Sequence, residues 1–196
     1  ELQRGPAQAP RLGTQKEPIH QFLNLSSFAE YMLVHEHAIA KVRPDMPLDR
    51  ACLIGCGVTT GVGAVIHTAK VEPGATVAVI GCGGVGDAAI AGARLAGART
   101  IVAVDIDDRK LEKATRFGAT HTGETERLDF VFDVVGRPET VVLGLRMLGH
   151  AGTLVYIGQR AGTDSSDFFG IASDGKVYSR TGVAHNWVLE GAPADY

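Results

Sequence analysis

A glycine-rich run is the strongest candidate for a binding site in this sequence. Gly81, Gly83 and Gly86 stand in G-C-G-G-V-G, and Asp105 follows about twenty residues later. In such a run the first glycine permits a tight turn, the second lets the backbone approach a diphosphate, and the third lets a helix pack closely on a strand. Amide hydrogens at the start of that helix would then face the phosphates. The pattern predicts a dinucleotide site, the alternative being a glycine-rich turn that binds nothing.

Asp105 would decide which dinucleotide is bound. A carboxylate at the tip of the second strand accepts hydrogen bonds from ribose hydroxyls and repels a 2′-phosphate, which favours NAD over NADP. The alternative is a strand-end acid that caps the following helix, although Asp107 and Asp108 already suit that position. Lys110 could reach the same ribose or be a solvated helix lysine. Cys82, inside the glycine run, is interpreted as a packing residue.

Cys56, in the run C-L-I-G-C-G-V-T-T-G-V-G, is a candidate metal ligand. Thiolates bind zinc, and a catalytic zinc takes three protein ligands and leaves one position open for substrate. Cys52 lies four residues earlier, but no histidine completes a recognised set, so a buried small hydrophobe is the alternative for Cys56. His35 and His37 alternate in H-E-H and are expected to be exposed residues on a strand. No Ser-His-Asp or Cys-His order can be argued from spacing.

After the turn at Pro73-Gly74, the sequence pattern alternates between strands and helices, and these carry the candidate residues. Short apolar runs predict strands at residues 75–80, 100–104, 128–135 and 152–157. Small or apolar residues at helical spacing, with acids or proline at the start and glycine beyond the end, predict helices at residues 85–96, 107–117 and 138–148. The alternation predicts an α/β fold with a parallel sheet covered by helices on both faces.

The stretch between the second helix and the third strand, G-A-T-H-T-G-E-T-E-R, is too short for a strand and a return helix. We therefore expect the edge strand at this place to be vestigial or absent. The sheet would then run in the spatial order second, first, third, fourth.

Outside this alternation, residues 1–17 are expected to be loop and residues 27–35 a strand. Two helical pieces are expected at residues 48–54 and 60–68, separated by the step G-C-G. Past residue 158 the strand-helix periodicity ends, and Asp174-Gly175 predicts a two-residue hairpin turn.

Composition excludes several classes of protein. The 196 residues include 45% hydrophobic and 21% charged residues, which is typical of a folded domain and not of a disordered chain. A net charge of -3 without a basic cluster argues against a nucleic-acid partner. We find no uninterrupted apolar stretch near the roughly 18 residues of a membrane helix and no signal peptide. Three cysteines suit a reducing compartment. We expect a soluble cytoplasmic protein and, because the chain begins at Glu1, a fragment or a processed product.

The quoted runs resemble the zinc-dependent medium-chain alcohol dehydrogenases. The similarity begins near E-P-I-H-Q-F-L, passes through A-C-L-I-G-C-G-V-T-T-G-V-G, V-A-V-I-G-C-G-G-V-G and I-V-A-V-D-I, and ends at G-T-L-V-Y-I-G. The stretches G-D-A-A-I-A-G-A-R-L-A-G and V-D-I-D-D-R-K-L-E-K-A look most like the branch that oxidises formaldehyde adducts of mycothiol, close in kind to the glutathione-dependent class.

The resemblance implies roles for particular residues. Cys56 matches the third ligand of the family's catalytic zinc, and Thr60 and Val85 match positions that press on the nicotinamide ring. Ile157 and Gly158 match the strand end whose backbone holds the carboxamide, and Gly84 belongs to the diphosphate loop. In such enzymes zinc polarises an alcohol or a hydroxymethyl-thiol adduct, which passes hydride to NAD.

Departures from the family limit what is expected. The first two zinc ligands, the proton-relay hydroxyl and a structural zinc lobe belong to a segment that would precede Glu1, and the stretch after Gly118 lacks a crossover helix. We expect residues 1–57 to be a remnant of a mostly β, GroES-like catalytic domain, residues 58–158 a truncated Rossmann-type doubly wound NAD-binding domain, and residues 159–196 an unassigned tail. As given, the chain would be incomplete for catalysis.

Two alternatives remain open at this stage. One is a non-catalytic dinucleotide-binding module. The other is a relative of the zinc-free quinone reductases, in which Cys56 would be incidental and NADP usually preferred, although Asp105 argues against that preference. The family also suggests a homo-oligomer, but the region that would form the dimer edge is not recognisable in this sequence.

Overall fold

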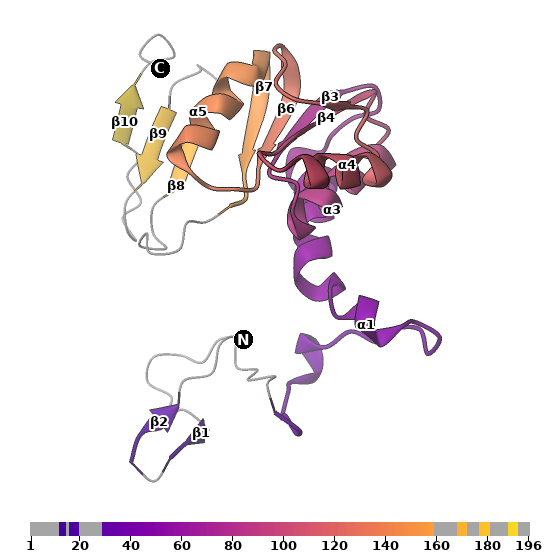
Figure 1. Ribbon diagram of the computed structural model, residues 1–196. Coiled ribbons are helices and arrows are strands. Elements are labelled where there is room, and N and C mark those ends of the chain that lie inside the picture. The colour runs from indigo at the N-terminus through magenta and orange to yellow at the C-terminus, as the bar shows by residue number, and fades with distance from the viewer. Residues whose placement is uncertain are drawn as a thin grey trace. The chain divides into compact units, whose positions relative to one another are not determined.

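A computed structural model describes residues 12–14, 16–19, 29–158, 168–171, 177–180 and 188–191 (Figure 1). The chain divides into two compact units, Glu1–Leu48 and Asp49–Tyr196, and each is described by itself.

The first unit contains little regular structure within its described residues. Strands β1 (Leu12–Gly13) and β2 (Pro18–Ile19) pair antiparallel, so a two-residue strand stands where only loop was expected. The strand expected at residues 27–35 is wrong over its described part, because residues 29–35 adopt no strand. His35 instead caps the 3-10 helix Glu36–Ala38, its Nδ1 accepting a hydrogen bond of 3.2 Å from His37 N. Weak alternation without a partner strand does not make a strand stable.

The second unit begins with a nearly continuous helix instead of the two separate helices that we expected. It comprises α1 (Leu48–Ala51), a π-helical segment (Ile54–Val58), α2 (Thr59–Gly63) and a second π-helical segment (Ala64–Ala69). The Gly-Cys-Gly step does not break the helix, because it lies inside the first π-helical segment, where the Thr59 hydroxyl donates to Ile54 O. The helix ends at Lys70, whose φ of 53° is left-handed.

This helix also corrects one expectation from composition. Leu48–Ala69 is 22 residues long with a mean hydropathy of 1.5 in its most apolar window, so by length and composition it could cross a membrane. Glycine, threonine and cysteine join the apolar residues here into one helix-length segment. The indication is weak, because helices in the cores of other proteins satisfy the same criteria. The absence of a membrane partner therefore stays a prediction.

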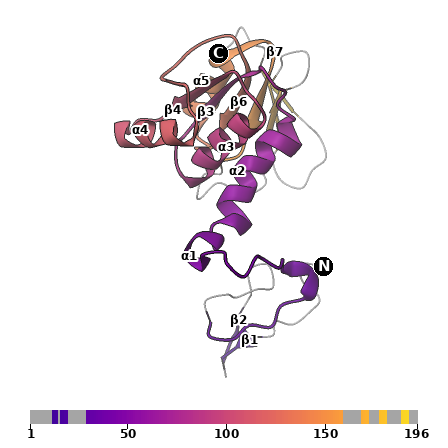
Figure 2. The ribbon, with the colours of Figure 1, turned by 90° about the vertical axis from the view of Figure 1, so that its right-hand side faces the viewer.

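The centre of the second unit is a five-stranded sheet in which every pairing is parallel. Its strands are β3 (Thr76–Ile80), β4 (Thr100–Val104), β5 (His121–Thr122), β6 (Leu128–Asp133) and β7 (Leu148–Tyr156). They lie in the order β5-β4-β3-β6-β7. Figures 1 and 2 label β3, β4, β6 and β7 of this sheet. The predicted order of the four main strands is confirmed, and the vestigial edge strand is β5, which has two residues.

Helices cover both faces of this sheet. They are α3 (Gly84–Leu95), α4 (Asp108–Phe117) and α5 (Pro138–Met147). Alternate residues of β3 face opposite sides: Val77 and Val79 pack in one core cluster with residues of α3 and α4. Ala78 and Ile80 pack in a second cluster with Met147 of α5. The second unit is therefore an α/β fold of the Rossmann type.

Three further strands follow the sheet. They are β8 (Phe168–Ile171), β9 (Val177–Arg180) and β10 (Val188–Gly191), which form a separate antiparallel sheet in the order β10-β9-β8. The hairpin turn predicted at Asp174-Gly175 lies outside the described residues, between two strands that pair antiparallel. The GroES-like remnant and the domain boundaries remain predictions.

Candidate dinucleotide site

The candidate site lies at the carboxyl ends of the parallel strands. The chain passes from β3 through β4 to β5 on one side and then returns to β6 on the other side of β3. Where strand order reverses in this way, the loops after the two central strands separate and leave a crevice for a ligand. The glycine-rich run follows β3 and residues 134–137 follow β6, so both loops face this position.

Two of the predicted glycines are required by close packing. Gly81 has a φ of 96°, and a β-carbon there would meet Val135 Cγ2 at 2.6 Å. A β-carbon on Gly86 would overlap the carbonyl oxygen of Gly81, so only glycine lets α3 start this close to β3. Val85, which precedes Gly86 in the first turn of α3, is half-buried.

The other two glycines of the run have open space instead. Gly83 and Gly84 are exposed, and a β-carbon on either would meet no heavy atom within 4 Å among the described residues. Gly83 is the N-cap of α3, and its carbonyl oxygen accepts a hydrogen bond of 2.7 Å from Asp87 N. The structure thus presents bare backbone at the start of a 12-residue helix, which suits the approach of an anion.

Asp105 lies beside this loop and is bonded to it. Its side chain is 6% exposed, Oδ2 accepts a hydrogen bond of 2.8 Å from Cys82 N, and Oδ1 accepts one of 3.0 Å from Asp107 N. Lys110 Nζ lies 3.8 Å from Oδ2. Asp107 is the N-cap of α4, and its Oδ1 accepts from Arg109 N, so Asp105 is not the capping residue of that helix.

Cys82 is a buried packing residue, as interpreted from the sequence, with 1% of its surface exposed. Its Sγ lies 3.7 Å from the Val104 carbonyl oxygen. Burial raises the pKa of the thiol to about 11, and the nearby charges of Asp105 and Asp87 act in the same direction. This thiol is therefore protonated and inert at neutral pH.

Sequence reasoning missed Asp133, at the end of β6. It is fully buried, and its Oδ1 accepts hydrogen bonds from Val135 N at 3.0 Å and Gly136 N at 3.2 Å. Its carbonyl oxygen accepts from Ile157 N at 2.8 Å and Gly158 N at 3.1 Å. The signal was available: like Asp105, it is an acid at the end of a buried strand and just before a turn.

Asp87 and Lys113 were also missed. The Asp87 side chain is 3% exposed in the first turn of α3, and its Oδ2 lies 2.8 Å from Lys113 Nζ of α4. Neither carboxylate oxygen accepts a well-aligned hydrogen bond from the described residues, so the ion pair is what offsets its charge. A buried acid at an apolar-looking helix position gives no clear signal in sequence.

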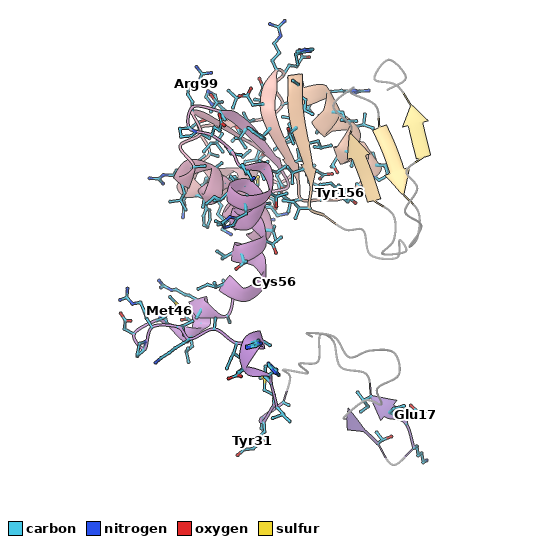
Figure 3. The ribbon with its side chains drawn as sticks, turned by 180° about the vertical axis from the view of Figure 1, so that it is seen from behind. Glu17, Tyr31, Met46, Cys56, Arg99 and Tyr156 are labelled. Atoms are coloured by element: carbon cyan, nitrogen blue, oxygen red, sulfur yellow. The ribbon has the colours of Figure 1, made fainter. Side chains whose placement is uncertain are left out.

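The remaining predicted residues lie on the long helix. A β-carbon on Gly61 would overlap Val85 O, so α2 packs on the first turn of α3. Thr60, next to Gly61 in the chain, is exposed. Cys56 is exposed within the π-helical segment, away from Tyr156 at the end of β7 (Figure 3). Among the described residues no three His, Cys, Asp or Glu side chains are placed to hold a metal ion. This described part of the chain therefore does not supply a complete zinc site.

Comparisons with known proteins agree with this architecture. The profile of the zinc-binding dehydrogenase family matches residues 84–185. The alcohol dehydrogenase class-3 of Pisum sativum is 50% identical over 110 residues, which are 56% of this chain and 29% of that protein. This chain thus spans under a third of the length of that relative.

Solved structures show the same likeness. A benzyl alcohol dehydrogenase from Acinetobacter calcoaceticus has a TM-score of 0.69 at 33% identity, covering 75% of this chain and 44% of that one. An alcohol dehydrogenase zinc-binding domain protein from Burkholderia ambifaria has a TM-score of 0.69 at 36% identity, covering 76% and 44%. With a family match over half of its length and these shared folds, the chain belongs to the zinc-binding dehydrogenase family.

Proposed function

We propose that this chain is the NAD-binding part of a zinc-dependent alcohol dehydrogenase-like oxidoreductase. The observation that carries the proposal is the position of Asp105: a carboxylate at the end of β4, 2.8 Å from the backbone of the glycine-rich loop after β3. This is where the adenosine ribose lies in dinucleotide-binding folds of this topology. A carboxylate there accepts bonds from the two ribose hydroxyls and repels a 2′-phosphate, so NAD is preferred over NADP.

Each half of the site has its own residues. Gly81, Gly83, Gly84 and Gly86 form the loop that receives the diphosphate at the start of α3, and Lys110 adds a positive charge beside Asp105. In the other half we assign Thr60 and Val85 to the nicotinamide ring, and the backbone of Ile157 and Gly158 to the carboxamide. NAD, when bound, supplies the hydride acceptor, and these residues bind and orient it.

The proposed substrate is a small alcohol, as the names of the similar proteins suggest, or a hydroxymethyl-thiol adduct, which rests on the sequence resemblance alone. Cys56 is proposed as one zinc ligand of the whole enzyme. Because the described residues hold no group of three metal-ligating side chains, this chain alone is expected to bind NAD without turning over alcohol. The same observation favours the second candidate, a dinucleotide-binding module without catalysis. A zinc-free quinone reductase is disfavoured by Asp105, which opposes NADP.

The expected setting is a soluble cytoplasmic protein with no nucleic-acid or membrane partner, and the family suggests a homo-oligomer. These statements rest on composition and on the resemblance to alcohol dehydrogenases.

Calorimetric titration of the full chain with NAD and with NADP tests the proposal. Wild type should bind NAD at least about tenfold more tightly than NADP, the size expected when a charge-assisted hydrogen bond is replaced by repulsion between like charges. Asp105→Ala should weaken NAD binding and reduce the preference. Asp129→Ala is the matched control, since Asp129 is an exposed aspartate at the amino end of β6, away from the carboxyl ends of the strands where the site lies. Equal affinity for both dinucleotides, or no binding of either, would contradict the proposal.

Zinc analysis of the same preparation separates the two candidate functions. Weak zinc binding that Cys56→Ser abolishes favours a piece of a zinc enzyme. NAD binding with no zinc binding that depends on Cys56 favours the non-catalytic module.

A further inference from the structure

The turn after β6 joins the two halves of the candidate site. A β-carbon on Gly158, at the end of β7, would overlap Gly136 N and lie 2.5 Å from Val135 C. On the other side, a β-carbon on Gly81 would lie only 2.6 Å from Val135 Cγ2, so the turn also packs tightly against the glycine-rich loop. The backbone of residues 134–136 therefore fills the space between the glycine-rich loop and the end of β7. Any shift of this turn must move one half relative to the other.

A buried carboxylate fixes that turn. Asp133 Oδ1 accepts from the N–H groups of Val135 and Gly136, and Oδ2 lies 3.0 Å from the hydroxyl oxygen of Thr140 in α5. A fully buried carboxylate is stable only when donors of this kind surround it. Asp133 thus ties the turn to α5 while its carbonyl oxygen holds the N–H groups of Ile157 and Gly158.

Two side chains outside β6 complete the arrangement. The Thr140 hydroxyl accepts from Arg137 N at 3.1 Å, and it can donate its single proton to Asp133 Oδ2 at 3.0 Å or to Arg137 O at 2.9 Å. The Tyr156 hydroxyl donates to Gly136 O at 3.3 Å, and burial raises its pKa, with the Asp133 charge acting in the same direction. The phenol therefore stays protonated and remains a donor to the turn.

We propose that Asp133, supported by Thr140 and Tyr156, is a positioning residue for the second half of the dinucleotide, the half that carries nicotinamide. The inference rests on the proposed NAD site and adds a role to Asp133, Thr140 and Tyr156, to which that proposal assigns none. In folds of this topology the second nucleotide lies over the strands beyond the switch point, which here are β6 and β7. Asp133 acts through the backbone of residues 134–136 and of Ile157 and Gly158, not by contact with the ligand.

A comparison of NADH with ADP-ribose tests this assignment on the full chain. ADP-ribose contains the adenosine, the diphosphate and the second ribose but lacks nicotinamide. Thr140→Val removes the donor to Asp133 Oδ2 and should weaken NADH binding about tenfold, the effect of one lost bond to a buried charge, while changing ADP-ribose affinity less than about twofold. Thr140→Ser keeps the hydroxyl and should bind both ligands as wild type does.

The matched control uses a like pair at the amino ends of the central strands β3 and β6, opposite the candidate site. There the Thr76 hydroxyl donates to Asp129 Oδ2 at 2.7 Å, and Asp129 N donates back to Thr76 Oγ1 at 3.0 Å. Thr76→Val should lower the melting temperature without changing the ratio of the two dissociation constants. If Thr140→Val does not fold, as judged by circular dichroism and the loss of a cooperative thermal transition, Tyr156→Phe decides. That milder change should weaken NADH alone, by about two- to threefold.

The outcomes separate the inference from the proposed function. Equal losses for NADH and ADP-ribose in Thr140→Val, or unchanged NADH affinity in the folded variant, overturn the inference and leave the NAD site standing. Equal affinity of wild type for ADP-ribose and NADH also overturns the inference and leaves the NAD site standing, because nicotinamide would then contribute no affinity that depends on its position. Wild type that binds neither ligand overturns both.

Discussion

The backbone N–H of Cys82 donates a hydrogen bond of 2.8 Å to Oδ2 of Asp105, so the acid at the end of β4 holds the glycine-rich loop after β3. Oδ1 accepts a second bond, from Asp107 N. A carboxylate has about four acceptor positions, so this one keeps capacity for two ribose hydroxyls. The same side chain can therefore fix the loop and bind the sugar, and these two tasks can be separated by substitution.

The substitution Asp105→Asn separates loop fixing from sugar binding, because the amide oxygen can still accept from Cys82 N while the negative charge is lost. We expect the preference for NAD over NADP to fall about tenfold, since a neutral amide does not repel a 2′-phosphate. The melting temperature should stay closer to wild type than in Asp105→Ala, which loses both acceptors. Paired titrations and thermal scans of the two variants measure this. If Asn and Ala lower stability equally, the bond to Cys82 does not hold the loop.

We expect Gly86→Ala to lower the stability of the fold and Gly83→Ala to lower the affinity for NAD. A β-carbon on Gly86 overlaps Gly81 O, so the helix must move away from the strand, and we expect a loss of about 3 kcal/mol or more in the free energy of unfolding. At Gly83 a β-carbon meets no described atom within 4 Å, so stability should change by less than about 1 kcal/mol. NAD affinity should nevertheless fall, because the methyl group would stand where the diphosphate approaches. Denaturant unfolding and titration of both variants provide the test, and normal NAD binding by Gly83→Ala would argue against that approach.

The sheet could be predicted from sequence because its strands are continuous apolar runs. Residues 75–80 and 100–104 are buried on both faces, so each run stands out from its polar flanks, and glycine or proline marks the helix ends. The glycine spacing likewise reflects one local geometry, the close packing of Gly86 against the carbonyl oxygen of Gly81, which leaves no room for a β-carbon. Local patterns of this kind need no knowledge of distant residues.

The errors came from features that depend on distant or weak contacts. The segment at residues 29–35 has strand-like residues but no partner, and the Gly-Cys-Gly step continues as a π-helical segment. Asp133 and Asp87 were missed because their partners, Thr140 and Lys113, lie on helices whose packing the sequence does not reveal. For Asp133 a strand-end position was a usable signal, whereas for Asp87 there was none.

The pair Asp87–Lys113 should stabilise the contact between α3 and α4. Lys113→Met leaves a buried carboxylate without its counter-charge, and we expect a loss of about 1–3 kcal/mol, reduced from the fully buried case because the lysine side chain is 56% exposed. Adding Asp87→Asn to Lys113→Met should recover part of that loss, since no buried charge then remains. A double-mutant cycle by urea unfolding measures the coupling. Additive effects of the two substitutions would show that the ion pair contributes nothing.

Cys82 should make stability depend on alkaline pH. Its pKa in the folded chain is raised from 9.0 to about 11, so the folded state holds the thiol proton more tightly than the unfolded state does. The resulting stabilisation is complete below about pH 9 and is lost as pH rises toward 11, and it amounts to about 2–3 kcal/mol from the size of the shift. Other groups titrate in this range, so the measurement is the difference between wild type and Cys82→Ala. That difference should fall with increasing pH above 9.

Alkylation gives the same thiol an independent test. Cys52 and Cys56 are exposed, whereas Cys82, within the glycine-rich loop, is buried and its pKa is raised to about 11. Iodoacetamide at pH 8 should therefore modify Cys52 and Cys56 in the folded chain and leave Cys82 intact, as read by mass spectrometry of peptides. Asp105→Ala should expose Cys82 to the reagent, because the bond from Cys82 N to that carboxylate is one of the contacts that keep the loop closed. Rapid modification of Cys82 in wild type would mean that the loop opens without any ligand, and the glycine-rich turn would then not be a preformed site.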